Sequence, residues 1–109
     1  MTVAYRYRAQ LVRVIDGDTY ELDVDLGFHV HTRITVRLRG WDCQERFTET
    51  GKLATAAAAA IITGPLIVET EKVHLVADTQ SFARYVADVW TDAGHVGELL
   101  AARGLATPR

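Results

Sequence analysis

Residues 19–26 read TYELDVDL, in which apolar or aromatic side chains alternate strictly with polar and acidic ones. Successive side chains of a β-strand point to opposite faces, so this period of two predicts a strand with one buried face. The expected buried face comprises Tyr20, Leu22, Val24 and Leu26, and the other face comprises Thr19, Glu21, Asp23 and Asp25. The segments on both sides of this strand also predict strands.

The neighbouring segments predict that this strand is the middle of a three-stranded meander. Residues 5–15 have the composition of a strand, and the sequence Asp-Gly-Asp at 16–18 is a hairpin-turn signal. After a turn at 27–28, residues 29–39 alternate again, with histidine and arginine side chains on the outer face. The side chains expected to point inward are Val30, Ile34, Val36 and Leu38.

The outer faces of the second and third strands have complementary charge. Glu21 and Asp23 are acidic, whereas Arg33 on the following strand is basic. Opposite charges placed across a strand pair stabilise it by about 0.2–1 kcal/mol. We therefore expect Glu21 or Asp23 to pair with Arg33.

The second half of the chain predicts a helix, two strands and a second helix. Residues 50–63 are rich in alanine, the best helix former, and Gly64-Pro65 ends that helix. Strands are expected at 66–76 and 84–91, and a final helix at 96–103. This order predicts an α+β, mainly β, class: a five-stranded OB-fold barrel with two helices.

The length and composition of the chain exclude several classes of protein. A chain of 109 residues with 49% hydrophobic and 24% charged residues is expected to form a single domain over residues 1–109. A net charge of −2 argues against a passive nucleic-acid binder that relies on bulk positive charge. One cysteine excludes an internal disulfide framework. The sequence has neither a membrane-spanning apolar window nor a signal peptide, so a cytoplasmic location is the expectation. A monomer is favoured as the oligomeric state.

Four short motifs resemble, in this order and at this spacing, the staphylococcal nuclease (thermonuclease) family. They are Asp16-Gly17-Asp18-Thr19, Arg37-Leu38-Arg39-Gly40-Trp41-Asp42-Cys43-Gln44-Glu45, Gly51-Lys52-Leu53-Ala54 and Phe82-Ala83-Arg84-Tyr85. The resemblance covers residues 12–106. It implies an OB-fold barrel that lacks the third, C-terminal helix of longer relatives. It also implies phosphodiester hydrolysis with DNA as the substrate, and RNA as a second candidate.

The resemblance implies a calcium site. By position, Asp18, Asp42 and the backbone carbonyl of Cys43 would bind Ca²⁺, and Asp16 would assist through the ion's water shell. A set of oxygen ligands suits a hard cation, whereas the Cys43 thiol does not. The expected cofactor is therefore Ca²⁺.

The resemblance also implies the catalytic groups. Arg37 and Arg84 would contact the scissile phosphate, and their planar guanidinium groups suit two phosphate oxygens at once. Glu45 would orient or deprotonate the attacking water, and the 5′-oxygen would leave to give a 3′-phosphate. Phe82 would stack on a base, whereas Arg39 is expected to lie on the surface.

The chain departs from the family pattern at three positions. Gln44 stands where proline commonly precedes the glutamate, and proline would restrict the backbone there. Ser81 replaces a basic residue, which removes a phosphate or base contact. Ala83 replaces a glycine, which is costly only if the backbone there has a positive φ.

Alternative interpretations remain open for the whole chain and for single residues. The chain could be a non-catalytic OB-fold module that binds nucleic acid or protein, or a structural protein that kept the fold. The Asp-Gly pair at 16–17 could have only a structural role, because Asp-Gly is a common hairpin turn. Cys43 could be a nucleophile only with His29 or His31 as its base. His29 and His31 share a strand face and could bind a metal, although histidines in such a pattern are more often exposed to solvent without a ligand. Retention of three acids and two arginines favours the enzyme.

Overall fold

The protein is described here by a computed structural model covering residues 4–71 and 84–109. The long strands are β1 (Ala4–Asp16), β2 (Thr19–Asp25), β3 (His31–Leu38), β5 (Leu66–Glu71) and β6 (Arg84–Thr91). The helices are α1 (Glu49–Ile61) and α2 (Val96–Ala102). Three short strands complete the set: β4 (Trp41–Asp42), β7 (Gly94–His95) and β8 (Thr107–Pro108).

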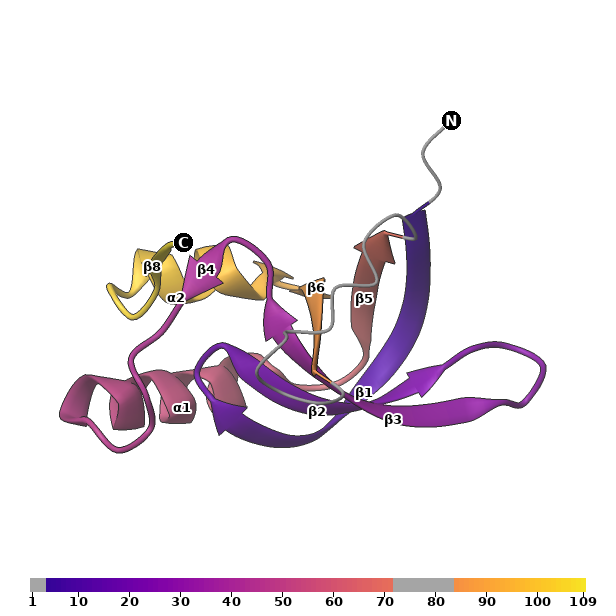
Figure 1. Cartoon of the computed structure of the whole chain (residues 1–109), viewed down its shortest axis with the longest axis horizontal. Helices are drawn as coiled ribbons and strands as arrows, with labels where there is room; N and C mark the ends of the chain where they lie inside the picture. The colour runs from indigo at the N-terminus through magenta and orange to yellow at the C-terminus, as the bar shows by residue number, and fades with distance from the viewer. Residues whose placement is uncertain (1–3, 72–83) are drawn as a thin grey trace.

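The five long strands close into a barrel, which confirms the predicted OB-type architecture. β1 pairs antiparallel with β5 through its first half and with β2 through its second half. Register shifts after Leu11 and after Val14 mark irregularities of the β-bulge type, which bend a strand and let it serve two partners. β2–β3 and β5–β6 are antiparallel, and a parallel β3–β6 pairing closes the ring (Figure 1).

The predicted inward faces are confirmed within the barrel and wrong at the hairpin tip. Tyr20, Leu22, Val24, Val36 and Leu38 are buried in one core, against which Ile34 packs. Leu26 is 40% exposed and Val30 is 49% exposed. The β2–β3 hairpin extends beyond the barrel (Figure 1), so these two side chains have no sheet to pack against.

The β2–β3 register places one of the two predicted acidic residues opposite Arg33. Asp23 lies opposite Arg33 in the β2–β3 register, as expected. Glu21 instead lies opposite Thr35, and its carboxylate is 3.5 Å from Nε of Arg13 on β1. β2 sits between two strands, so its outward carboxylates meet cations from both sides.

The helices end close to their predicted limits. The N-cap of α1 is Thr48, whose side-chain oxygen accepts from the N–H of Gly51 at 2.9 Å. The helix ends at Ile61, two residues earlier than predicted, and Gly64 has a φ of 73° before Pro65. None of the helices in the described ranges is long and apolar enough to cross a membrane.

One pairing was not predicted. β4 and β8 form a two-stranded sheet in which Trp41 lies opposite Pro108 and Asp42 lies opposite Thr107. The backbone N–H of Arg109 continues this contact by donating to the carbonyl of Gly40 at 2.9 Å. The pairing brings residues 107–109 beside Asp42, near the C-terminus marked in Figure 1.

Candidate active site

The turn between β1 and β2 is held tightly against α1. A side chain at Gly17 would place its Cβ 2.7 Å from the Cβ of Ala54 and 3.1 Å from the Cβ of Cys43. Contacts this short leave no room for a side chain, so glycine is required by close approach. The buried phenol of Tyr20 donates to the carbonyl of Gly17 and fixes the turn from the barrel side. Three of the four sequence motifs therefore meet at one place.

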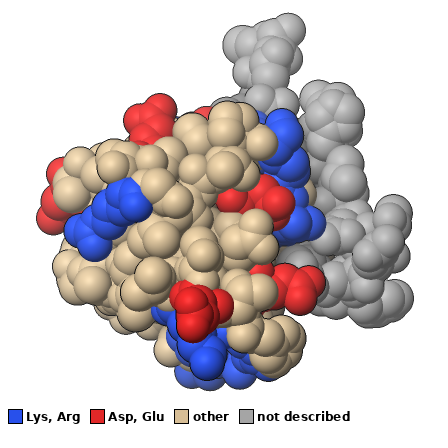
Figure 2. Space-filling model, turned by 90° about the vertical axis from the view of Figure 1, so that its left-hand side faces the viewer, with Lys and Arg blue, Asp and Glu red and all other residues tan. Residues whose placement is uncertain are grey.

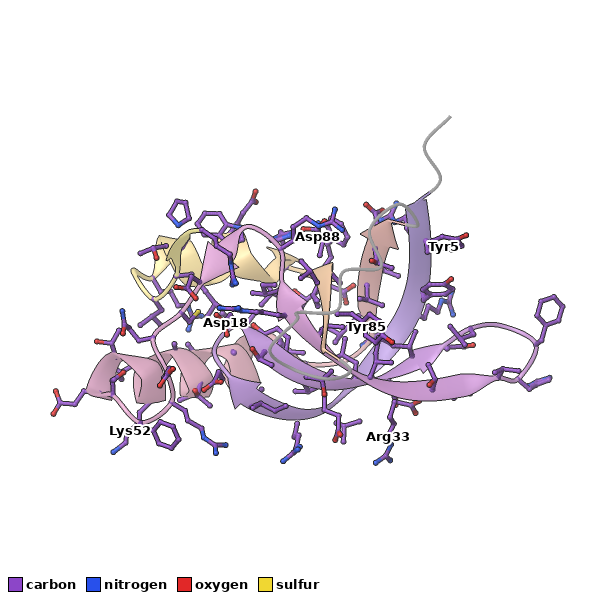
Figure 3. All side chains as sticks on the ribbon, viewed as in Figure 1. Tyr5, Asp18, Arg33, Lys52, Tyr85 and Asp88 are labelled. Carbon is purple, nitrogen blue, oxygen red and sulfur yellow. The ribbon has the colours of Figure 1, made fainter. Side chains whose placement is uncertain are left out.

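Asp18 is a buried carboxylate, with only 4% of the residue exposed. Its Oδ1 accepts from the hydroxyl of Thr19 at 3.0 Å, and its Oδ2 accepts from the backbone N–H of Cys43 at 3.0 Å. Its backbone carbonyl accepts from Leu38 at 2.8 Å. A buried carboxylate is costly unless its oxygens have partners. These bonds meet that requirement and fix the direction of the side chain (Figure 3).

Arg37 joins Asp18 to the second predicted aspartate. From β3, its Nη2 lies 3.2 Å from Oδ1 of Asp42, and its Nε lies 3.9 Å from Oδ2 of Asp18. Charge-assisted contacts of this kind are stronger than neutral hydrogen bonds. The structure thus brings together two carboxylates and one guanidinium from three separate segments of the chain.

A second guanidinium, from Arg109, reaches the same two carboxylates. Its Nη2 is 3.6 Å from Oδ2 of Asp18 and 3.8 Å from Oδ1 of Asp42, and it donates to the carbonyl of Trp41. Arg109 was not predicted from the sequence. No local motif contains it, and a two-residue strand such as β8 leaves no periodic signal from which its position could have been found.

Cys43 has an unreactive thiol. Its side chain is half-buried, and burial raises its thiol pKa from 9.0 to about 12, with the negative charges of Asp18 and Asp42 adding to the effect. The sulfur is therefore protonated at neutral pH, and a thiol is a far weaker nucleophile than a thiolate. The part of Cys43 that takes part in the site is its backbone, whose N–H binds Asp18.

The backbone of Glu45 is fixed although its side chain is exposed. Its carbonyl accepts from the N–H of Thr48 at 3.0 Å and from the Thr48 hydroxyl at 2.9 Å. A Cβ at Gly51 would lie 1.6 Å from that carbonyl oxygen. Thr48 and Gly51 thus hold the segment in which Gln44 replaces the expected proline.

The other predicted site residues have no described side-chain contact with Asp18 or Asp42. Asp16 accepts from the backbone N–H of Arg46 through Oδ1 at 3.0 Å. Arg84 begins β6 opposite Thr35, and the described part of it is its backbone. Phe82 lies outside the described residues, as do Ser81 and Ala83.

The acidic groups form a pair rather than a larger cluster. In residues 4–71 and 84–109, no three His, Cys, Asp or Glu side chains converge as metal ligands would. Glu45 therefore does not add its carboxylate to those of Asp18 and Asp42 in this arrangement. Nδ1 of His31 lies 3.5 Å from Oδ1 of Asp23, so the imidazole already has a polar partner in the protein.

The donor chemistry of the pair fits a hard cation. Asp18 Oδ2 and Asp42 Oδ1 both lie within 4 Å of the same guanidinium nitrogen, so one positive group can reach both oxygens. Ca²⁺ takes carboxylate, carbonyl and water oxygens in flexible geometry. Two carboxylates with water completing the shell would satisfy it.

Charge on the neighbouring surface is mixed. In the face turned to the viewer in Figure 2, blue and red side chains are scattered within the face and at its edge, and other residues cover most of it. The described residues in view offer no continuous basic surface. A polyanion bound on this face would therefore contact individual basic side chains rather than a continuous positively charged surface.

No protein-family model matches the chain, and no curated protein matches it.

Proposed function

We propose that the protein is a Ca²⁺-dependent phosphodiesterase of the staphylococcal nuclease type, acting on DNA and, as a second substrate class, on RNA. One observation carries the proposal. Asp18 stands in one of the family motifs, Arg37 and Asp42 stand in another, and the three side chains meet within 4 Å. A pair of carboxylates beside a planar guanidinium is suited to a cation and a phosphate at adjacent positions.

Each residue has a distinct role in this proposal. Asp18 and Asp42 hold the cation, and the Cys43 carbonyl is the third protein ligand. Bound Ca²⁺ supplies Lewis-acid polarisation of a phosphate oxygen. Arg37 and Arg84 donate to phosphate oxygens and follow the charge that grows on them in the transition state.

Proton transfer falls to Glu45 in this proposal. Its exposed carboxylate takes a proton from the attacking water. The water oxygen forms a bond to phosphorus while the bond between phosphorus and the 5′-oxygen breaks. The leaving 5′-oxygen takes a proton from solvent, and a 3′-phosphate remains. The fixed backbone at Glu45 supports this role because it limits where the carboxylate can move.

A second candidate is a non-catalytic OB-fold module that binds nucleic acid or protein. It is favoured by the contacts of the carboxylate pair, because Arg37 and Arg109 already neutralise Asp18 and Asp42. It is also favoured by the position of Glu45, whose carboxylate is not gathered with the pair. In this candidate the four charges serve stability alone.

Single-turnover cleavage of labelled DNA, measured beside binding to an uncleavable analogue, separates the two candidates. We expect Asp18→Asn and Asp42→Asn to lose cleavage in Ca²⁺, with Asp92→Asn in the exposed β6–β7 turn as the matched control. Binding without any cleavage by the wild-type protein would support the module and contradict the enzyme.

A further inference from the structure

Arg109 contacts the carboxylate oxygens that a bound cation would need. Its Nη2 lies 3.6 Å from Oδ2 of Asp18 and 3.8 Å from Oδ1 of Asp42. The other oxygen of Asp18 is engaged by the hydroxyl of Thr19. A cation that entered between the two aspartates would therefore meet the oxygens that Arg109 already holds.

Charge at this point is balanced without a metal. Asp18 and Asp42 contribute two negative charges, and Arg37 and Arg109 contribute two positive charges. A divalent cation added to this group leaves an excess of two positive charges within a few ångströms, and like charges at that distance repel. Cation binding is then favoured by the departure of one guanidinium.

Arg109 is the guanidinium that can leave more easily. Arg37 belongs to β3, which is paired on both sides within the barrel. Arg109 follows β8, an exposed two-residue strand whose ladder joins it to β4 alone among the described strands. Elements with few backbone bonds and little burial open at low free-energy cost.

We propose that Arg109 is an internal cation that occupies the Asp18–Asp42 pair and that a divalent cation displaces it on binding. This inference rests on the proposed calcium site. Because the guanidinium and the metal compete for the same oxygens, Arg109 lowers the affinity of the site for Ca²⁺. It thereby sets the calcium concentration at which the site fills.

The test is a metal titration that needs no substrate. Tb³⁺, a hard oxygen-seeking cation, is the probe, and its luminescence is excited through Trp41, the residue before Asp42. Competition by Ca²⁺ then gives the calcium affinity. Arg109→Gln should bind Ca²⁺ on the order of 10-fold more tightly than the wild-type protein, a coupling of ordinary size for two ligands that exclude each other.

Two further variants control the comparison. Arg103→Gln removes an equal charge at the exposed end of α2 and should leave the affinity unchanged. Arg109→Lys retains the charge without the planar fork and should give an intermediate affinity. This variant also carries the test if Arg109→Gln fails to fold.

The outcomes separate this inference from the proposed function. Tighter binding by Arg109→Gln but not by Arg103→Gln supports displacement. Equal affinity in the wild-type protein, Arg109→Gln and Arg109→Lys overturns the displacement and leaves the calcium site standing. No Tb³⁺ or Ca²⁺ binding by any of these proteins overturns the calcium site itself, and the displacement with it.

Discussion

Replacing Gly51 by alanine tests how the start of α1 holds the site. In an exposed helix position, glycine to alanine stabilises by about 0.5–1 kcal/mol. At Gly51 the added Cβ would lie 1.6 Å from the carbonyl oxygen of Glu45 and 2.8 Å from Oγ1 of Thr48. No pair of non-bonded atoms can remain 1.6 Å apart, so the Glu45 segment has to move away from α1.

The size of the effect follows from the bonds that this movement breaks. The Glu45 carbonyl accepts two hydrogen bonds from Thr48, each contributing about 0.5–1.5 kcal/mol. Loss of the Thr48 cap adds about 1 kcal/mol. After the helix-propensity gain, Gly51→Ala should lower the free energy of unfolding by about 1–3 kcal/mol.

Urea denaturation measures that loss. Ala56→Gly, at an exposed position of the same helix, isolates the propensity term and should cost about 1 kcal/mol. A Gly51→Ala protein that is more stable than wild type would refute the close approach between the Glu45 segment and α1. The same variant should also cleave DNA more slowly in a single turnover, because Glu45 would be displaced.

Three other variants probe the site and its support. Tyr20→Phe should lower the free energy of unfolding by about 1–3 kcal/mol in urea, because the carbonyl of Gly17 loses its buried donor; unchanged stability would remove Tyr20 from the support of the turn. Because the pKa of Cys43 is raised from 9.0 to about 12, the native state keeps a proton that the unfolded state releases, so stability should fall as pH rises from 9 towards 12. Cys43→Ser should show a shallower fall and keep its activity at neutral pH, and an identical pH profile would contradict the raised pKa. Arg37→Ala should lower single-turnover cleavage on the order of 10²–10³-fold with little loss of affinity for uncleavable DNA, and Arg37→Lys should not restore it; a pure loss of affinity would favour the binding module, and Arg33→Ala is the matched control.

The barrel could be predicted from the sequence because alternation determines which face of a strand is buried. The same alternation continues through Leu26 and Val30, which the structure leaves exposed beyond the barrel. An alternating pattern predicts the face to which each side chain points. It does not predict where the neighbouring strand ends. The hairpin tip shows this limit most clearly, since Phe28 is 97% exposed with a positive φ of 55°.

Sequence patterns identify only some of the residues that meet at the candidate site. Asp18 directly precedes β2, Arg37 lies near the end of β3 and Asp42 lies on the short strand β4. All three stand in compact sequence motifs, so a local pattern marks each of them. Arg109 reaches the same carboxylates through a two-residue pairing between segments far apart in the sequence. Contacts of that kind depend on the finished fold and leave no local pattern.

The most direct test of the central claim is the calcium dependence of DNA cleavage by the wild-type protein. A single-turnover time course is run in saturating Ca²⁺ and again in excess EGTA, and the product ends are treated with phosphatase before extension by a polymerase. We expect cleavage in Ca²⁺, none in EGTA, and ends that can be extended only after phosphatase removes a 3′-phosphate. Undiminished cleavage in EGTA, or no cleavage in either condition, would contradict a catalytic calcium site at Asp18 and Asp42.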